Sequence, residues 1–186
     1  MTGTLDKSAA RRAGFARRKV AHDTRAVDTA AHLSALLAGY RGVPIAGFLP
    51  IRTEIDPTPA MAQAARHGPV GVPVIMGADQ PLHFACWTPG TELIAGEFGV
   101  MIPDRPVWMV PELVILPLLA FTGQGGRLGY GGGFYDRTLE RLRANGPILA
   151  IGFAFAAQQD DALPLEPTDQ RLDMIVTERG VVDFRA

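Results

Sequence analysis

A glycine-rich run, Gly125–Asp136 (GGRLGYGGGFYD), follows the most apolar segment of the chain, Leu113–Phe121, and leads into a predicted helix from Phe134 to Asn145. A buried strand, a glycine loop and a helix in this order are typical of α/β proteins, which bind ligands at the carboxyl ends of their strands. Glycines allow positive φ and a close approach to the ligand, so backbone N–H groups can point at phosphate oxygens. The helix N-terminus adds partial positive charge. The run therefore predicts a phosphate-binding loop that seats a nucleotide.

This run matches neither of the common nucleotide-binding fingerprints. A dinucleotide-binding GxGxxG would need glycine where Phe134 stands, and no Gly-Lys-Ser/Thr tripeptide of a P-loop occurs in the chain. A plain turn is the alternative interpretation. Two charged side chains argue against it. Arg127 offers a guanidinium suited to phosphate, and Asp136 either interacts with the helix dipole or holds a divalent cation.

The rest of the chain alternates apolar and helical segments. One helix is predicted over residues 7–37, ended by Gly39 and Gly42, and a second over 56–68 with Asp56 as its cap. The Pro- and Gly-rich stretch 88–111 is expected to be a long surface connection. The predicted strands are 45–49, 70–76, 82–87, 113–121, 148–155, 174–177 and 181–184. This alternation predicts one domain over 1–186, with a mainly parallel sheet covered on both faces.

Composition restricts the class of partner. The chain has 186 residues and a formal net charge of -1, so it gives no general reason to expect nucleic-acid or membrane binding, although residues 7–25 are locally basic. A single cysteine, Cys86, excludes an internal disulfide and fits a reducing compartment. No apolar run reaches the roughly 20 residues that span a bilayer. We therefore expect a cytoplasmic protein, without a zinc site because its histidines lack metal-binding spacing.

Several segments, in the same order along the chain, resemble the 5-formyltetrahydrofolate cyclo-ligase family. The glycine segment Arg127–Arg137 (RLGYGGGFYDR), preceded by Leu116–Phe121 (LPLLAF), is similar to the signature of that family. Lys7–Arg11 (KSAAR) resembles its N-terminal Lys-x-x-x-Arg helix. Phe48–Asp56 (FLPIRTEID) resembles its strand with a Glu-Ile pair, and Asp169–Glu178 (DQRLDMIVTE) resembles its closing segment.

The resemblance implies an ATP- and Mg²⁺-dependent conversion of 5-formyltetrahydrofolate, with or without a polyglutamate tail, to 5,10-methenyltetrahydrofolate. ADP and phosphate would be released. It also implies an α/β/α sandwich similar to the ribose-5-phosphate isomerase and CoA-transferase group. We expect a monomer or a small homo-oligomer.

Site residues follow from the resemblance by position. Arg127 is the candidate for stabilising charge on the transferred phosphoryl group. The implied ATP contacts are Lys7, Arg11, Arg127, Leu128, Gly129, Tyr130, Gly131, Gly132, Gly133, Phe134 and Tyr135. The implied folate contacts are Leu49, Glu54, Tyr130 and Phe134. The implied metal ligands are Asp136 and Asp169.

Three positions depart from the family pattern. Phe134 stands where a Tyr is common, Thr122 where an Asp often follows the Ala-Phe pair, and Ile102 in a run where a Glu is frequent. Two other classes of protein stay open. A phosphate-ligand enzyme of the sugar-phosphate isomerase type would need a carboxylate beside the loop but no ATP. An RNA-binding module using the basic helix would bind in a strongly salt-dependent way.

Overall fold

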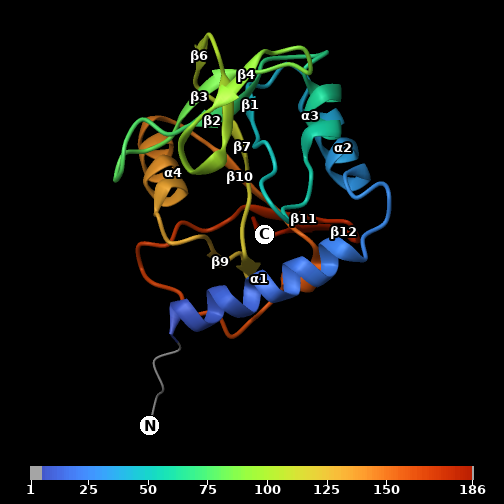
Figure 1. Cartoon of the computed structure of the whole chain (residues 1–186), viewed down its shortest axis with the longest axis vertical. Helices are drawn as coiled ribbons and strands as arrows, with labels where there is room; N and C mark the ends of the chain where they lie inside the picture. Colours follow the sequence, from blue (N-terminus) through green and yellow to red (C-terminus); the bar gives the residue numbers. More distant parts are fainter. Residues whose placement is uncertain (1–5, 186) are drawn as a thin grey trace.

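The apolar segments assemble into an eight-stranded sheet in the computed structural model, which describes residues 6–185. Its strand order is β12-β11-β10-β7-β1-β2-β3-β6 (Figure 1). The five strands from β11 to β2 run parallel, and the strands at both edges are antiparallel. The bounds are β1 Ile45–Ala46, β2 Val70–Val74, β3 His83–Cys86, β6 Trp108–Met109, β7 Leu113–Leu116, β10 Leu149–Phe153, β11 Met174–Thr177 and β12 Gly180–Asp183.

Helices cover both faces of this sheet. Helix α4 (Phe134–Asn145) lies on one face, and α2 (Ala31–Leu37) and α3 (Thr58–Ala64) lie on the other (Figure 1). Successive residues of a strand point to opposite faces, so Val114 packs with α4 while Ile115 packs with α2 and α3. All four residues of β7 are buried. The predicted α/β/α sandwich with a mainly parallel sheet is thereby confirmed. That residues 1–186 form a single domain stays a prediction.

The predicted strand 113–121 is interrupted at Pro117. Beyond β7 the chain bends into a short antiparallel pair, β8 (Ala120–Phe121) and β9 (Arg127–Leu128), before it enters α4. The bend leaves two carbonyl groups outside the main sheet. Buried Gln158 satisfies both, since its Nε2 donates to Leu118 O at 2.8 Å and Leu119 O at 3.1 Å. Gln158 belongs to a short 3₁₀ turn, η3 (Ala156–Gln158), after β10.

The single helix predicted over residues 7–37 is wrong. Helix α1 (Lys7–Asp23) ends at Thr24, whose hydroxyl donates to Val20 O at 2.9 Å. Asp28 then accepts a hydrogen bond from Ala30 N at 3.2 Å, just before α2 begins. Thr and Asp side chains compete for backbone hydrogen bonds in this way and so favour helix ends over interiors. A 3₁₀ turn, η1 (Ala38–Tyr40), continues α2.

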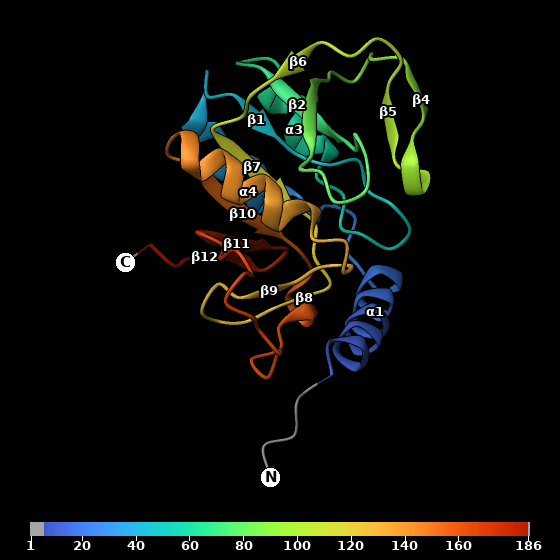
Figure 2. The ribbon, with the colours of Figure 1, turned by 90° about the vertical axis from the view of Figure 1, so that its left-hand side faces the viewer.

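The long surface connection predicted over residues 88–111 is also wrong, because the stretch contains strands. β4 (Leu93–Ala95) and β5 (Met101–Pro103) form a hairpin closed by a 3₁₀ turn, η2 (Glu97–Gly99), and β6 follows. Figure 2 shows the hairpin beside the β2–β3 end of the main sheet, and Leu93 packs against the core. The turn of the hairpin holds Phe98 at φ 55° and Gly99 at φ 78°. Ile102, one of the departures noted above, lies in β5.

Helix α1 crosses the molecule below the sheet, apart from the two helical layers (Figures 1 and 2). At Gly14 the helix lies close to the backbone between β7 and β8, because an added Cβ atom would be 2.9 Å from the backbone oxygen of Leu119. Only glycine allows a helix to approach another backbone this closely. Among residues 6–185, no helix is long and apolar enough to cross a membrane.

Gly14→Ala tests this contact. Replacing glycine by alanine inside a helix ordinarily stabilises a protein by about 0.5–1 kcal/mol. Here the methyl group would overlap a carbonyl oxygen that is fixed by Gln158, so we expect the free energy of unfolding in urea to fall by about 1–2 kcal/mol. Gly39→Ala is the control, because an added Cβ there meets nothing within 4 Å. A Gly14→Ala protein as stable as the wild type would contradict the contact.

Candidate active site

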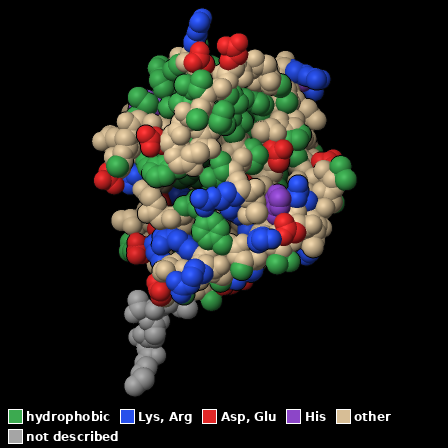
Figure 3. All heavy atoms as spheres, viewed as in Figure 1, with side chains coloured by type: hydrophobic (Ala, Val, Ile, Leu, Met, Phe, Trp, Pro, Cys, Tyr) green, Lys and Arg blue, Asp and Glu red, His purple; other side chains and the backbone are tan. Residues whose placement is uncertain are grey.

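One face of α1 carries a row of basic residues toward the glycine loop. Lys7, Arg11, Gly14 and Arg18 follow one another at spacings of four, three and four, so they share a face of the helix. The Arg11 Nε donates to Gly129 O at 3.2 Å, while Arg18 is 1% exposed. Lys and Arg side chains gather over the lower part of the molecule, where α1 lies (Figure 3).

The glycine loop between β9 and α4 needs its glycines. Gly131 has φ 102° and Gly133 has φ 64°, a region that other residues rarely adopt. Gly131 is also crowded, because an added Cβ would lie 3.1 Å from the Arg11 guanidinium carbon. Gly133 is the N-cap residue of α4, so the positive end of the helix dipole faces the loop. The exposed backbone of this loop has the form expected for an anion site.

Arg127 lies beneath this loop and not within it. It belongs to β9, and its side chain is 4% exposed. Its Nη2 donates to Asp136 Oδ1 at 2.6 Å. Burial lowers the pKa of Arg127, while the negative charges of Asp136 and Asp169 act to raise it. Its Nε is buried without a hydrogen-bond partner within residues 6–185.

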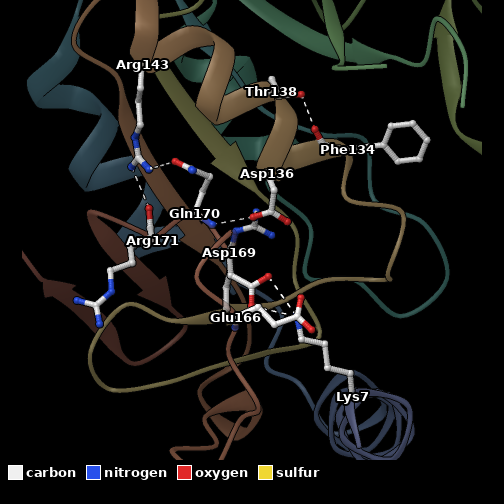
Figure 4. Close-up of polar contacts among 10 residues, drawn as sticks. Lys7, Phe134, Asp136, Thr138, Arg143, Glu166, Asp169, Gln170 and Arg171 are labelled. Atoms are coloured by element: carbon white, nitrogen blue, oxygen red, sulfur yellow. Dashed lines mark hydrogen bonds and ion pairs between the residues drawn. The ribbon is translucent and has the colours of Figure 1, made fainter. Parts of the chain in front are cut away.

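Two carboxylates flank Arg127. Asp136, in the first turn of α4, also accepts a hydrogen bond from Gln170 N at 2.8 Å, which ties the segment 166–173 to the helix (Figure 4). Asp169, next to Gln170, accepts from Lys7 Nζ at 3.1 and 3.2 Å. Lys7 also pairs with Glu166 at 3.0 Å. The charged side chains at this site are therefore paired with one another.

The charge of Lys7 is secured by these pairs. Burial by itself lowers the pKa of Lys7, but the hydrogen bonds to Glu166 and Asp169 outweigh it, and the net shift is upward. A lysine with a raised pKa stays protonated at neutral pH and can offer its charge to a phosphate in place of the carboxylates. Because Glu166 is exposed, that exchange requires little displacement of packed atoms.

Two of the implied folate residues, Glu54 and Tyr130, form a second cluster with Arg18. The Tyr130 hydroxyl donates to Glu54 Oε1 and accepts from Arg18 Nη1. Ile51 N donates to Glu54 Oε2 at 2.9 Å. Burial raises the pKa of Glu54, with Tyr130, Ile51 and Arg18 opposing the shift. Burial also raises the pKa of Tyr130, so its hydroxyl is protonated and donates.

Phe134 has lost a hydroxyl relative to the common family residue but keeps exposed ring surface. Its ring centroid lies 6.3 Å from that of Phe98 in the β4–β5 hairpin, and the Arg137 guanidinium carbon lies 5.2 Å from it. Thr122, the other departure, retains an acceptor function, because its hydroxyl accepts from Gly126 N at 3.0 Å. A threonine at this position can therefore hold the β8–β9 turn.

The structure places most of the predicted site residues around the loop, with some differences in role. The Leu128 side chain is buried with Ala120 and Leu163, so it can reach a ligand only through its backbone. Leu49 is half-buried against the core on the α2–α3 face. Two residues were missed. Arg18 continues the Lys7–Arg11 face, a spacing that the sequence displays, whereas no sequence signal places Glu166 beside Lys7.

A separate cavity lies away from this loop. Its volume is about 660 Å³, and its lining includes Trp108, Arg141 and residues just before β7 and β10, such as Glu112 and Pro147. These residues mark the amino ends of the parallel strands, whereas the glycine loop lies beyond the carboxyl end of β7. Ligands of open α/β sheets bind at the carboxyl ends. The charged cluster at the loop is therefore the better candidate site.

The chain is similar to known proteins of one family. A model of the 5-formyltetrahydrofolate cyclo-ligase family matches residues 6–178. The 5-formyltetrahydrofolate cyclo-ligase of Escherichia coli K12 is 35% identical over 150 residues, which cover 75% of this chain and 80% of that protein. The namesake from Mycolicibacterium smegmatis is 35% identical over 131 residues, 65% of this chain but only 61% of the relative.

A solved structure supports the same relationship. The NMR structure of Aquifex aeolicus 5,10-methenyltetrahydrofolate synthetase superposes with a TM-score of 0.73 at 25% identity, covering 97% of this chain and 93% of that one. The family match includes the basic face of α1, the glycine loop and both flanking carboxylates. This chain belongs to the 5-formyltetrahydrofolate cyclo-ligase family.

Proposed function

We propose that this protein converts 5-formyltetrahydrofolate to 5,10-methenyltetrahydrofolate at the expense of ATP, releasing ADP and phosphate. The observation that carries the proposal is the arrangement at the glycine loop, where Arg127 lies beneath exposed glycine backbone between Lys7 and Asp136. A triphosphate needs such a combination of cations and backbone donors. The single cysteine and ordinary composition support a cytoplasmic setting for the reaction.

The chemistry requires no covalent intermediate with the protein. The formyl oxygen attacks the γ-phosphorus of ATP, a new P–O bond forms, and the bond to ADP breaks. N10 of the folate then attacks the activated formyl carbon and releases its proton to solvent. Phosphate leaves with the former formyl oxygen, and a C=N bond to N5 remains in the product. Because the substrates supply both nucleophiles, the protein contributes positioning and charge stabilisation.

Arg127 is assigned to the phosphoryl group. Its guanidinium can donate in a fork to phosphate oxygens while Asp136 holds it in place. The alternative to this role is a purely structural pairing of Arg127 with a carboxylate, and the contact with Asp136 is such a pair. The two roles are compatible, since a guanidinium has five donors and Asp136 accepts from only one of its nitrogens.

Asp136 and Asp169 are the residues that would hold a Mg²⁺ ion. Among the described residues no cluster of three metal-binding side chains exists. However, Mg²⁺ is commonly held by one or two carboxylates together with substrate phosphates, and Asp136 and Asp169 supply that number. When bound, the ion would neutralise charge on the phosphates. Lys7 would then exchange its carboxylate partners for phosphate oxygens, while Arg127 stays paired with Asp136.

On the folate side we assign Tyr130 and Phe134 as ring surfaces and Glu54 as the anionic group of the pocket. Tyr130 is 39% exposed although its hydroxyl is buried against Glu54, so one part of its ring is free for contact. Glu54 itself is buried and hydrogen-bonded to Tyr130, so it acts on the folate through Tyr130. Leu49 adds apolar surface next to the Ile51–Glu54 turn.

Incubation of the pure protein with 5-formyltetrahydrofolate, ATP and Mg²⁺ tests the activity through the near-ultraviolet absorbance of the methenyl product. The absorbance is expected to rise only when ATP is present. A protein that binds phosphate ligands but shows no ATP-dependent rise would instead favour an enzyme of the sugar-phosphate isomerase type.

We expect Arg127→Ala to lower the turnover number by about 10²–10³-fold, as the loss of one charged donor to a transition state does. Arg127→Lys keeps the charge but not the forked donors, so its turnover number is expected to lie between those of the wild type and Arg127→Ala. Circular dichroism checks folding, and Arg179→Ala, an exposed arginine near β12, is the control. Wild-type turnover in Arg127→Ala would make this residue purely structural.

Asp136→Asn is expected to raise the Mg²⁺ concentration needed for half-maximal activity about tenfold, because it removes a metal-binding charge but keeps acceptors for Arg127 and Gln170. Asp173→Asn is a matched control. Asp173 has similar exposure and an arginine partner, Arg143 at 3.2 Å, but lies outside the proposed site. An equal change in the Mg²⁺ requirement of both variants would contradict the metal role.

A further inference from the structure

Arg18 is a buried cation whose side chain the proposed reaction does not yet use. It is 1% exposed and lies on α1, two turns beyond Arg11. Arginine is rarely buried this completely, because removing its charge from water costs several kcal/mol unless the charge is paired. The partners of Arg18 therefore indicate what its burial achieves.

Those partners converge on Tyr130. Arg18 Nη1 donates to the Tyr130 hydroxyl, and the same nitrogen lies 3.8 Å from Glu54 Oε1. Arg18 Nε donates to Thr53 Oγ1 at 3.1 Å, which fixes the plane of the guanidinium relative to the turn that carries Glu54. One side chain of α1 thus connects the glycine loop to the turn after β1.

The ring of Tyr130 is held as firmly as its hydroxyl. Its centroid lies 5.7 Å from that of Phe15, and the Arg18 guanidinium carbon lies 5.4 Å from both ring centroids. Because the hydroxyl is fixed between Arg18 and Glu54, both torsion angles of the tyrosine side chain are constrained. The exposed part of the ring is therefore a fixed surface, suited to a flat ring such as a pterin.

The arrangement carries a cost that a purely structural pair would avoid. Arg18 Nη2 is buried and has no hydrogen-bond partner within the described residues, and an unsatisfied buried donor costs about 1–3 kcal/mol. An apolar side chain of similar size would fill this space without that cost. The side chain that bears this cost contacts the residues assigned to the folate, which connects Arg18 with their function.

We propose that Arg18 is a positioning residue that holds Tyr130 and Glu54 in the geometry that receives the folate ring. The inference rests on the proposed function, since it assigns the second cluster to folate. Arg18 does not touch the substrate. Its loss is therefore expected to weaken folate binding through Tyr130 and to leave ATP binding unchanged.

Arg18→Lys tests this role, because lysine keeps the charge but cannot donate from fixed positions to Thr53 and Tyr130 together. The KM for 5-formyltetrahydrofolate is expected to rise about tenfold, corresponding to one lost charged hydrogen bond, while the KM for ATP changes less than about twofold. Arg17→Lys is the matched control. Arg17 is on the same helix and pairs with Asp160 at 2.8 Å, away from Tyr130, so both KM values should stay at the wild-type level.

Tyr130→Phe provides an independent variant, because it removes the shared hydroxyl and keeps the ring. It is expected to show the same selective rise in the folate KM, even if Arg18→Lys does not fold. In the double variant the two increases in the folate KM should not multiply, since both changes break the same Arg18–Tyr130 contact. The expected folate KM of the double variant lies within about threefold of the larger single effect.

The outcomes separate the two proposals. A wild-type protein that forms no methenyl product with ATP overturns the proposed function, and the role of Arg18 with it. An active wild type overturns the role of Arg18 alone if either single variant keeps the wild-type folate KM. The same holds if Arg18→Lys raises both KM values equally or if the double variant multiplies the single effects.

Discussion

The close packing of α1 on the bend after β7 is the contact on which the site depends. Gly14 allows the helix to lie against the backbone of Leu119, and Gln158 holds that backbone from the other side. Once α1 is docked there, its spacing of four, three and four residues directs Lys7, Arg11 and Arg18 at the loop. This docking also brings Arg18 within hydrogen-bonding distance of Tyr130.

Electrostatics then divide the site into two parts. Around Arg127, three acidic side chains and two cations form ion pairs. Lys7, Glu166 and Asp169 are partly exposed, so Lys7 can exchange its carboxylate partners for a nucleotide at modest cost. Around Glu54, the charges are buried and held by hydrogen bonds, so this part is rigid. A site with one exchangeable and one fixed part suits a reaction in which a phosphoryl group must approach a held folate.

Much of the fold was predictable because the apolar pattern is strong. α4 and β11 have the predicted bounds, and β2 and β3 lie within the predicted strands 70–76 and 82–87. The errors fall where local hydrogen bonds or short strands outweigh composition. The single predicted helix is interrupted between Thr24, at the end of α1, and Asp28, just before α2. The Pro- and Gly-rich stretch after β3 folds into the β4–β5 hairpin.

The sequence by itself determined the strand–glycine loop–helix unit, the basic α1 face and the resemblance to one family, because these depend on residues close together along the chain. Only the tertiary structure decided which charges meet. Lys7 and Asp169 are 162 residues apart and Arg18 and Tyr130 are 112 apart, so no local pattern records their contact. Burial, which also depends on the tertiary structure, distinguishes Arg18 from the more exposed arginines of the same helix.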